Sequence, residues 1–224
     1  MAEGDKQPRQ LPSDPEVGAL MIKRAGLIAS FGFAFDGVLR TLSTQRNMKI
    51  HWISGLAVML VGMALELDIS ARASVLFCVF VVLCMEILNT AFEAFVDLHV
   101  RQYARTAMIA KDAAAAAVLV LAFAAVIVFA DILFHRWRMI LHSEPAILRT
   151  VLAGVPLLVV VGAILTLRRS MPLIGILTVV AVGLVSYLAW YSRDEVFSLA
   201  ALSFVVGSVL TRVREPALLG PRQA

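Results

Sequence analysis

The chain has 224 residues, of which 60% are hydrophobic and 16% are charged, whereas an ordinary soluble domain has roughly 45–50% and about 25%. The formal net charge is +4, from 20 Lys and Arg against 16 Asp and Glu, and these charges are too scattered for a nucleic-acid-binding surface. Cys78 and Cys84 lie in one apolar block, so no disulfide framework is indicated. The composition predicts a membrane protein and excludes a secreted, disordered or fibrous chain.

The amino-terminal part of the chain divides into a polar segment and a periodic one. Residues 1–19 are rich in proline and charge and lack the apolar core of a secretory signal, so we predict a flexible cytoplasmic tail. Between Ser30 and Leu42, apolar residues recur every three or four positions, while Asp36 and Arg40 fall on the opposite side. This pattern predicts an amphipathic helix on the membrane surface.

The rest of the chain contains apolar blocks of about the ~20 residues that a helix needs to cross a bilayer. They are Ile50–Leu67, Ala73–Val96, Ala113–Leu133, Leu148–Leu167, Leu173–Tyr191 and Val196–Leu210. If the amino terminus is cytoplasmic, most Lys and Arg residues outside these blocks fall on the cytoplasmic side, as the positive-inside rule requires. We therefore predict an all-α, polytopic membrane helix bundle with both termini in the cytoplasm.

The second apolar block carries a stripe of polar residues. Glu86, Asn89, Glu93 and Asp97 are spaced three, four and four positions apart, which places them on one narrow side of a helix that turns about 100° per residue. A carboxylate in hydrocarbon costs roughly 2.5 kcal/mol or more, and the predicted spans offer no interior Lys or Arg to neutralise it. We interpret the stripe as functional rather than as structural ion pairing, and its oxygen donors suit Mg²⁺.

Lys111 and Asp112 follow at the start of the third block, on the membrane face that the stripe reaches at Asp97. An ammonium group there attracts phosphate, and Asp112 adds a further carboxylate. Without the stripe, a solvated pair at a helix start is the favoured interpretation.

These residues belong to a pattern that resembles a known family, the prokaryotic integral-membrane diacylglycerol kinases and undecaprenol kinases. The resemblance covers roughly residues 20–135. The segments that carry it are Glu86-Ile-Leu-Asn-Thr-Ala-Phe-Glu-Ala-Phe-Val-Asp97, Tyr103, Ala110-Lys-Asp-Ala-Ala-Ala-Ala-Ala-Val118, Phe31 to Gly37, and Arg46-Asn-Met-Lys-Ile-His51.

The resemblance implies a lipid kinase domain over residues 20–138, with a surface helix and three spans, assembled as a homotrimer with active sites between subunits. It implies ATP-dependent phosphorylation of undecaprenol or diacylglycerol in the prokaryotic inner membrane. Residues 139–224 are not explained by it, and we expect them to form an accessory transmembrane module of about three further spans.

The resemblance also implies roles for individual residues. Glu86 would be the general base for the lipid hydroxyl, Asn89 would orient groups at the reacting centre, and Glu93 would hold Mg²⁺. The residues implied to bind ATP are Asp97, Tyr103, Lys111 and Asp112.

Two positions depart from the family pattern. The family usually has a glutamate, a second metal ligand, where this chain has Gln45, and a histidine where it has Ala104. An amide oxygen ligates Mg²⁺ without contributing charge, so Gln45 favours an alternative: a catalytically weakened membrane scaffold with the kinase fold. A transporter is a more distant alternative, because no inverted repeat or broken-helix pair is apparent.

Overall fold

The computed structural model describes the chain outside a few segments, and the predicted tail over residues 1–19 lies outside the described part. Every regular element in the described part is a helix. The chain divides into two compact units, Met1–Asp36 and Gly37–Ala224. The described residues are 26–65, 67–100, 102, 104–167, 171–192 and 194–219.

The first helix, α2, runs from Leu27 to Thr44 and crosses the boundary between the units. It contains the helix predicted from Ser30 to Leu42 and extends it at both ends. In its first half, the side chains of Phe31 and Phe33 are exposed. In its second half, which belongs to the second unit, Leu39 and Leu42 are buried.

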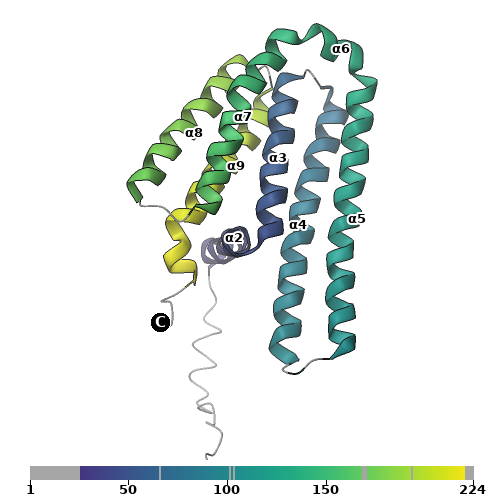
Figure 1. Cartoon of the computed structure of the whole chain (residues 1–224), viewed down its shortest axis with the longest axis vertical. Coiled ribbons are helices and arrows are strands. Elements are labelled where there is room, and N and C mark those ends of the chain that lie inside the picture. The colour runs from purple at the N-terminus through teal and green to yellow at the C-terminus, as the bar shows by residue number, and fades with distance from the viewer. Residues whose placement is uncertain are drawn as a thin grey trace, which may run out of the picture. The chain divides into compact units, whose positions relative to one another are not determined.

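The next three helices are α3 (Arg46–Ala64), α4 (Ile69–His99) and α5 (Arg105–His135). Figure 1 shows α4 and α5 as a long antiparallel hairpin, with α3 beside α4. The start of α4 is capped by Asp68, whose carboxylate accepts a hydrogen bond of 2.8 Å from the backbone N–H of Ala71.

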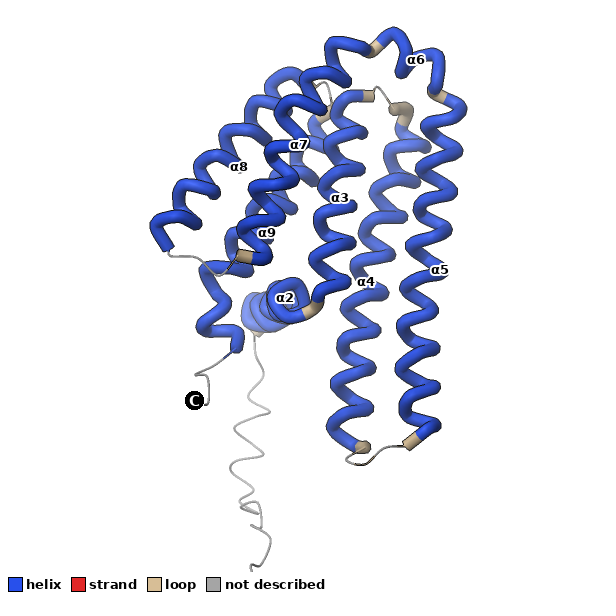
Figure 2. Tube along the Cα trace, viewed as in Figure 1, coloured by secondary structure: helices blue, strands red, loops and turns tan. Residues whose placement is uncertain are grey.

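The remaining helices are α6 (Trp137–His142), α7 (Glu144–Thr166), α8 (Met171–Tyr191) and α9 (Glu195–Leu219). The short helix α6, which the hydrophobic pattern did not predict, joins the α4–α5 hairpin to the last three helices (Figure 2). These pack against one another, and α7 and α9 also pack against α3.

Helix α3 is the centre of the second unit, because it contacts α4 on one side and α7 and α9 on the other. Close approach depends on small residues: a Cβ atom on Gly62 would lie 2.7 Å from the ring of Phe197, and one on Gly207 would lie 2.6 Å from Trp52. The indole N–H of Trp52 also bonds to α9. The buried residues of α3 are Met48, Trp52, Gly55, Leu56, Met59, Leu60, Gly62 and Met63.

Five of the described helices are long and apolar enough to cross a membrane: α4, α5, α7, α8 and α9. These lengths and compositions confirm the predicted polytopic membrane helix bundle. The first predicted span, Ile50–Leu67, falls mostly on α3, which ends at Ala64 and whose first turns carry Arg46, Lys49 and His51. Because neighbouring helices surround most of α3, it needs less apolar surface toward lipid than the other five.

Candidate active site

The polar stripe of α4 passes from a buried environment to an exposed one. Glu86 is 2% exposed and Asn89 is 6% exposed, whereas Glu93 is half-buried and Asp97 is exposed near the α4–α5 turn. A continuous helix from Ile69 to His99 keeps all four on one side, as the spacing predicted. The stripe therefore connects the interior of the bundle with the end of the hairpin.

Asn89 and Glu93 are joined within the stripe. The Asn89 amide donates a hydrogen bond of 3.3 Å from Nδ2 to Oε1 of Glu93. The other end of the amide, Oδ1, is buried and has no hydrogen-bond partner among the described residues. A buried amide oxygen without a partner costs about 1–3 kcal/mol, so this oxygen is available to a cation or to a donor on a ligand.

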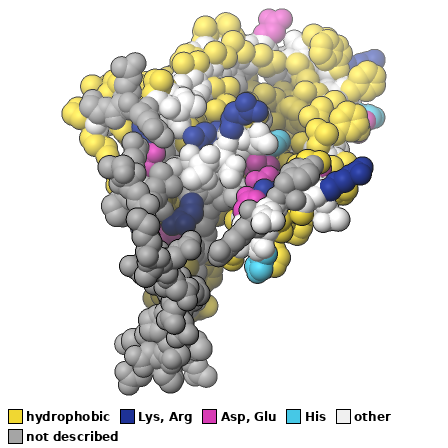
Figure 3. Space-filling view, turned by 60° about the horizontal axis from the view of Figure 1, so that its bottom comes forward, with side chains coloured by type: hydrophobic (Ala, Val, Ile, Leu, Met, Phe, Trp, Pro, Cys, Tyr) yellow, Lys and Arg dark blue, Asp and Glu magenta, His cyan; other side chains and the backbone are white. Residues whose placement is uncertain are grey.

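Lys111 and Asp97 connect the exposed end of the stripe to α5. The Nζ atom of Lys111 lies 2.6 Å from Oδ1 of Asp97, and this ion pair joins the start of α5 to the end of α4. Asp112 is exposed one residue further along α5. Figure 3, in which the lower end of Figure 1 comes forward, shows Asp, Glu, Lys and Arg side chains close together on this face.

Gln45 lies in the single-residue junction between α2 and α3. Its backbone N–H donates to the Thr41 carbonyl at 2.9 Å, and its carbonyl accepts from the Lys49 N–H at 3.3 Å. Its half-buried side chain makes no hydrogen bond that caps α3. Tyr103 lies outside the described residues, and the described ones contain no group of three or more His, Cys, Asp or Glu placed to hold a metal.

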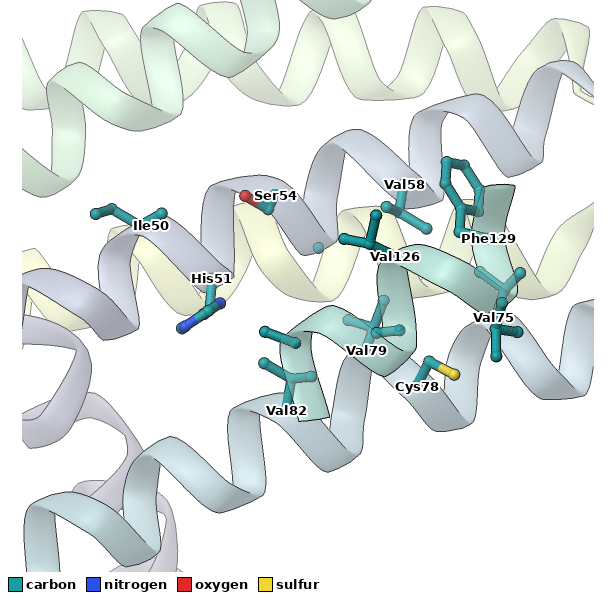
Figure 4. Close-up of a pocket in the computed structure, with 14 residues that line it drawn as sticks. Ile50, His51, Ser54, Val58, Val75, Cys78, Val79, Val82, Val126 and Phe129 are labelled. Carbon is teal, nitrogen blue, oxygen red and sulfur yellow. The ribbon is translucent and has the colours of Figure 1, made fainter. Parts of the chain in front are cut away.

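A groove between α3, α4 and α5 lies next to the stripe and was not predicted. It encloses about 270 Å³, and most of its lining is apolar, with His51 and Ser54 as polar exceptions (Figure 4). From the sequence, we expected the apolar residues that line this groove to serve helix packing only. A signal was present, because Val75, Val79 and Val82 fall within about 40° of Glu86 around a helix that turns about 100° per residue.

Comparison with known proteins finds relatives of the first part of the chain. The model of the family described as prokaryotic diacylglycerol kinase matches residues 32–133. A diacylglycerol kinase of Synechocystis sp. is 47% identical over 103 residues, which are 46% of this chain and 59% of that protein. An undecaprenol kinase of Bacillus subtilis is 38% identical over 93 residues, 42% of this chain and 76% of that protein.

A diacylglycerol kinase of Escherichia coli is 28% identical over 111 residues, 50% of this chain and 91% of that protein. No solved structure matches the chain. The helices are those of a polytopic membrane protein, and the chain belongs to the prokaryotic diacylglycerol kinase family. The predicted resemblance is thereby confirmed.

The chain spans 59% of the length of the Synechocystis relative. Every candidate site residue, from Gln45 to Asp112, falls within the matched residues 32–133. Helices α7, α8 and α9 follow the matched segment.

Proposed function

We propose that this protein is an ATP-dependent lipid kinase that transfers a phosphoryl group to the hydroxyl of a membrane lipid alcohol, undecaprenol first and diacylglycerol second. The observation that carries the proposal is Glu86, a carboxylate that is 2% exposed within a helix long and apolar enough to span a membrane. Burying such a group is energetically costly, and ionisable residues inside membrane spans usually mark functional sites. The names of the relatives support the same reaction.

In this proposal Glu86 is the general base. It accepts the proton of the lipid hydroxyl while the hydroxyl oxygen forms a bond to the γ-phosphorus of ATP, and the bond to the leaving ADP oxygen breaks. A positioned base typically contributes about 10²–10⁴ in rate. Asn89, one turn further along α4, orients the reacting groups.

Mg²⁺ and ATP bind at the more exposed end of the stripe. The carboxylate of Glu93 is an oxygen donor that fits a hard cation, and Gln45 adds an amide oxygen. Oδ1 of Asn89, which has no partner among the described residues, is a further oxygen on the same stripe. When bound, Mg²⁺ neutralises charge on the phosphate oxygens, which is the main electrostatic requirement of phosphoryl transfer.

The phosphates of ATP compete with Asp97 for the ammonium group of Lys111, since the two side chains form an ion pair at 2.6 Å. Asp112 and Tyr103 complete the nucleotide site.

The remaining features follow from the predicted topology and from the resemblance to the family. Both termini face the cytoplasm, so the α4–α5 turn meets ATP on the cytoplasmic side of the inner membrane. Three copies of the chain form a homotrimer with active sites between subunits. Residues 139–224 act as an accessory membrane module beside the kinase domain of residues 20–138.

A catalytically weakened scaffold is the second candidate, and Gln45 is the observation that favours it. If a neutral amide replaces a charged metal ligand, affinity for Mg·ATP falls, and the fold would then serve partner binding.

The test is a phosphorylation assay with purified full-length protein in mixed micelles containing labelled ATP and Mg²⁺. Undecaprenol, diacylglycerol and ceramide are offered in parallel. We expect labelled undecaprenyl phosphate, with slower labelling of diacylglycerol. Absence of label on all three lipids, across a titration of Mg²⁺, would make the scaffold the better conclusion.

A further inference from the structure

The last helix, α9, contacts the chain on both sides of the junction between α2 and α3 at Gln45. On α3, the indole N–H of Trp52 donates to the Phe204 carbonyl of α9 at 3.1 Å. On α2, the guanidinium of Arg40 donates to the Leu218 carbonyl at the end of α9 at 2.5 Å. Helix α9 rises about 21 Å between these two carbonyls at 1.5 Å per residue, so it bridges the junction.

A small polar pocket of about 60 Å³ is lined by residues from both sides of the junction and from α9. Ser43 belongs to α2 and Lys49 to α3, whereas Ser208, Thr211 and Arg212 belong to α9. In sequence, all five lie between the residues that form the two hydrogen bonds. The end of α2, the start of α3 and the second half of α9 therefore meet around the junction.

Helix α9 is itself held firmly in the bundle. A Cβ atom on Gly55 of α3 would lie 2.9 Å from the ring of Phe204, so α9 cannot shift along α3 without steric overlap. The guanidinium of Arg212 also donates to the Leu167 carbonyl at 2.7 Å, where α7 ends. The carboxyl-terminal end of α9 is thus a fixed point to which another helix can be attached.

The hydrogen bond from Arg40 satisfies a carbonyl that α9 cannot satisfy alone. The last four carbonyls of a helix have no partner within the helix, and Leu218 is the next-to-last residue of α9. A guanidinium at the negative end of a helix dipole is favourable, and its charge strengthens the hydrogen bond. The contact therefore ties the end of α2 to α9.

We propose that α9 positions the metal and ATP site through Arg40. The inference rests on the proposed kinase function, in which Gln45 adds an oxygen to Mg²⁺. Gln45 is the single residue between α2 and α3, and its backbone is extended, with φ −91° and ψ 125°. The place of its side chain therefore depends on where the two flanking helices are held. Arg40 is a positioning residue in this proposal, and α9, which follows the matched residues 32–133, controls how tightly Mg·ATP binds.

Removal of the guanidinium tests the proposal. Arg40→Ala releases the end of α2 from α9, and we expect the KM for Mg·ATP to rise by about three- to ten-fold, the scale of one hydrogen bond. The KM for undecaprenol and kcat at saturating Mg·ATP should stay at their wild-type values, because Glu86 and its surroundings on α4 are untouched. Arg138→Ala removes the same side chain from an exposed position on α6 and should keep wild-type kinetics throughout.

An unchanged KM for Mg·ATP in Arg40→Ala would overturn the proposal. So would an equal rise in both KM values or a fall in kcat alone, since these would show a general disturbance of the enzyme and not a shift of the metal and ATP site.

A second measurement does not depend on turnover. Hydrogen exchange of the backbone amides is followed by mass spectrometry in full-length wild type, Arg40→Ala and Arg138→Ala, each purified in micelles. We expect faster exchange over residues 41–49 in Arg40→Ala only, because local opening becomes easier once the helix end is released. Exchange over these residues that equals wild type would overturn the proposal. Faster exchange in a protein that phosphorylates no lipid would support the link between α2 and α9 and contradict only the proposed kinase function.

Discussion

The two halves of this protein bury polar groups for different reasons. In α9 and the turn before it, buried polar side chains have partners: Asp194 forms an ion pair with Arg72 at 2.9 Å and accepts a 3.0 Å hydrogen bond from the Phe197 N–H. Ser208 accepts from the Trp52 indole and donates to the Phe204 carbonyl. In α4, by contrast, the buried Oδ1 of Asn89 has neither a hydrogen bond nor an ion pair among the described residues. The buried Nε of Arg72 also has no hydrogen bond there, but it is held by the ion pair with Asp194.

The difference distinguishes buried polar groups that stabilise the fold from those that can take part in a reaction. A buried polar group that is fully paired fixes the packing of helices, whereas a buried group with spare capacity stores a cost that a ligand relieves. The paired groups connect α9 to α3 and α4, and the unpaired oxygen lies on the stripe of Glu86 and Glu93. The proposal therefore places the chemistry on α4 and gives α9 a structural role.

Two single substitutions, one in α4 and one in α9, test the difference between the two halves most strongly. Asn89→Leu removes the unpartnered oxygen and the bond to Glu93, and we expect lipid phosphorylation to fall by about 10–100-fold, as when groups that support a metal site are lost. Ser208→Ala removes a buried hydroxyl that is already paired, and its activity should equal that of the wild type. The measurement is the initial rate with undecaprenol at saturating Mg·ATP. Equal losses in both variants would remove the distinction between the halves.

Gln45→Glu tests the departure from the family pattern. If Glu93 and residue 45 both hold the metal, an added carboxylate should tighten apparent Mg·ATP binding by ~1–2 kcal/mol, or about five- to thirty-fold. Initial rates across a Mg²⁺ titration at fixed ATP measure the change. A Mg²⁺ dependence unchanged from wild type would show that residue 45 does not face the metal.

Trp52→Phe should have the smallest effect and should act on stability alone. It removes an indole N–H that bonds to the Phe204 carbonyl at 3.1 Å and to Ser208 Oγ at 3.0 Å, a loss of about 1 kcal/mol. Thermal unfolding in detergent should show a lower midpoint, with activity per folded protein retained. Trp190→Phe, at a side chain that is 83% exposed, should leave the midpoint in place. A loss of activity without a loss of stability in Trp52→Phe would place α9 in the catalytic machinery.

Much of the candidate site could be predicted from the local sequence. The spacing of Glu86, Asn89, Glu93 and Asp97 fixes their common side on α4, because helical geometry depends only on separation along the chain. The junction at Gln45 follows from the change between the surface helix and the apolar block. The ion pair of Lys111 with Asp97 was not specified, although both residues were predicted at the same membrane face.

Other features depend on contacts between distant parts of the chain. The packing of Trp52 against Phe204 and Gly207 joins residues about 150 positions apart, which no local pattern contains. The last helix continues beyond the predicted end at Leu210, because Arg212 pairs with Glu215 and donates to the Leu167 carbonyl. The groove was not predicted, because the valines that line it follow the same pattern as residues that only pack against neighbouring helices.

The most direct test compares one substitution of the same kind in each half. Glu86→Gln and Asp194→Asn each replace a buried carboxylate, 2% and 7% exposed, by an amide of nearly equal volume. Both full-length variants are assayed for transfer of label from ATP to undecaprenol, after chromatography confirms that each is folded. We predict that Glu86→Gln loses about 10²–10⁴ in rate, while Asp194→Asn retains wild-type turnover with reduced thermal stability. Undiminished transfer by Glu86→Gln would contradict the assignment of Glu86 as the base.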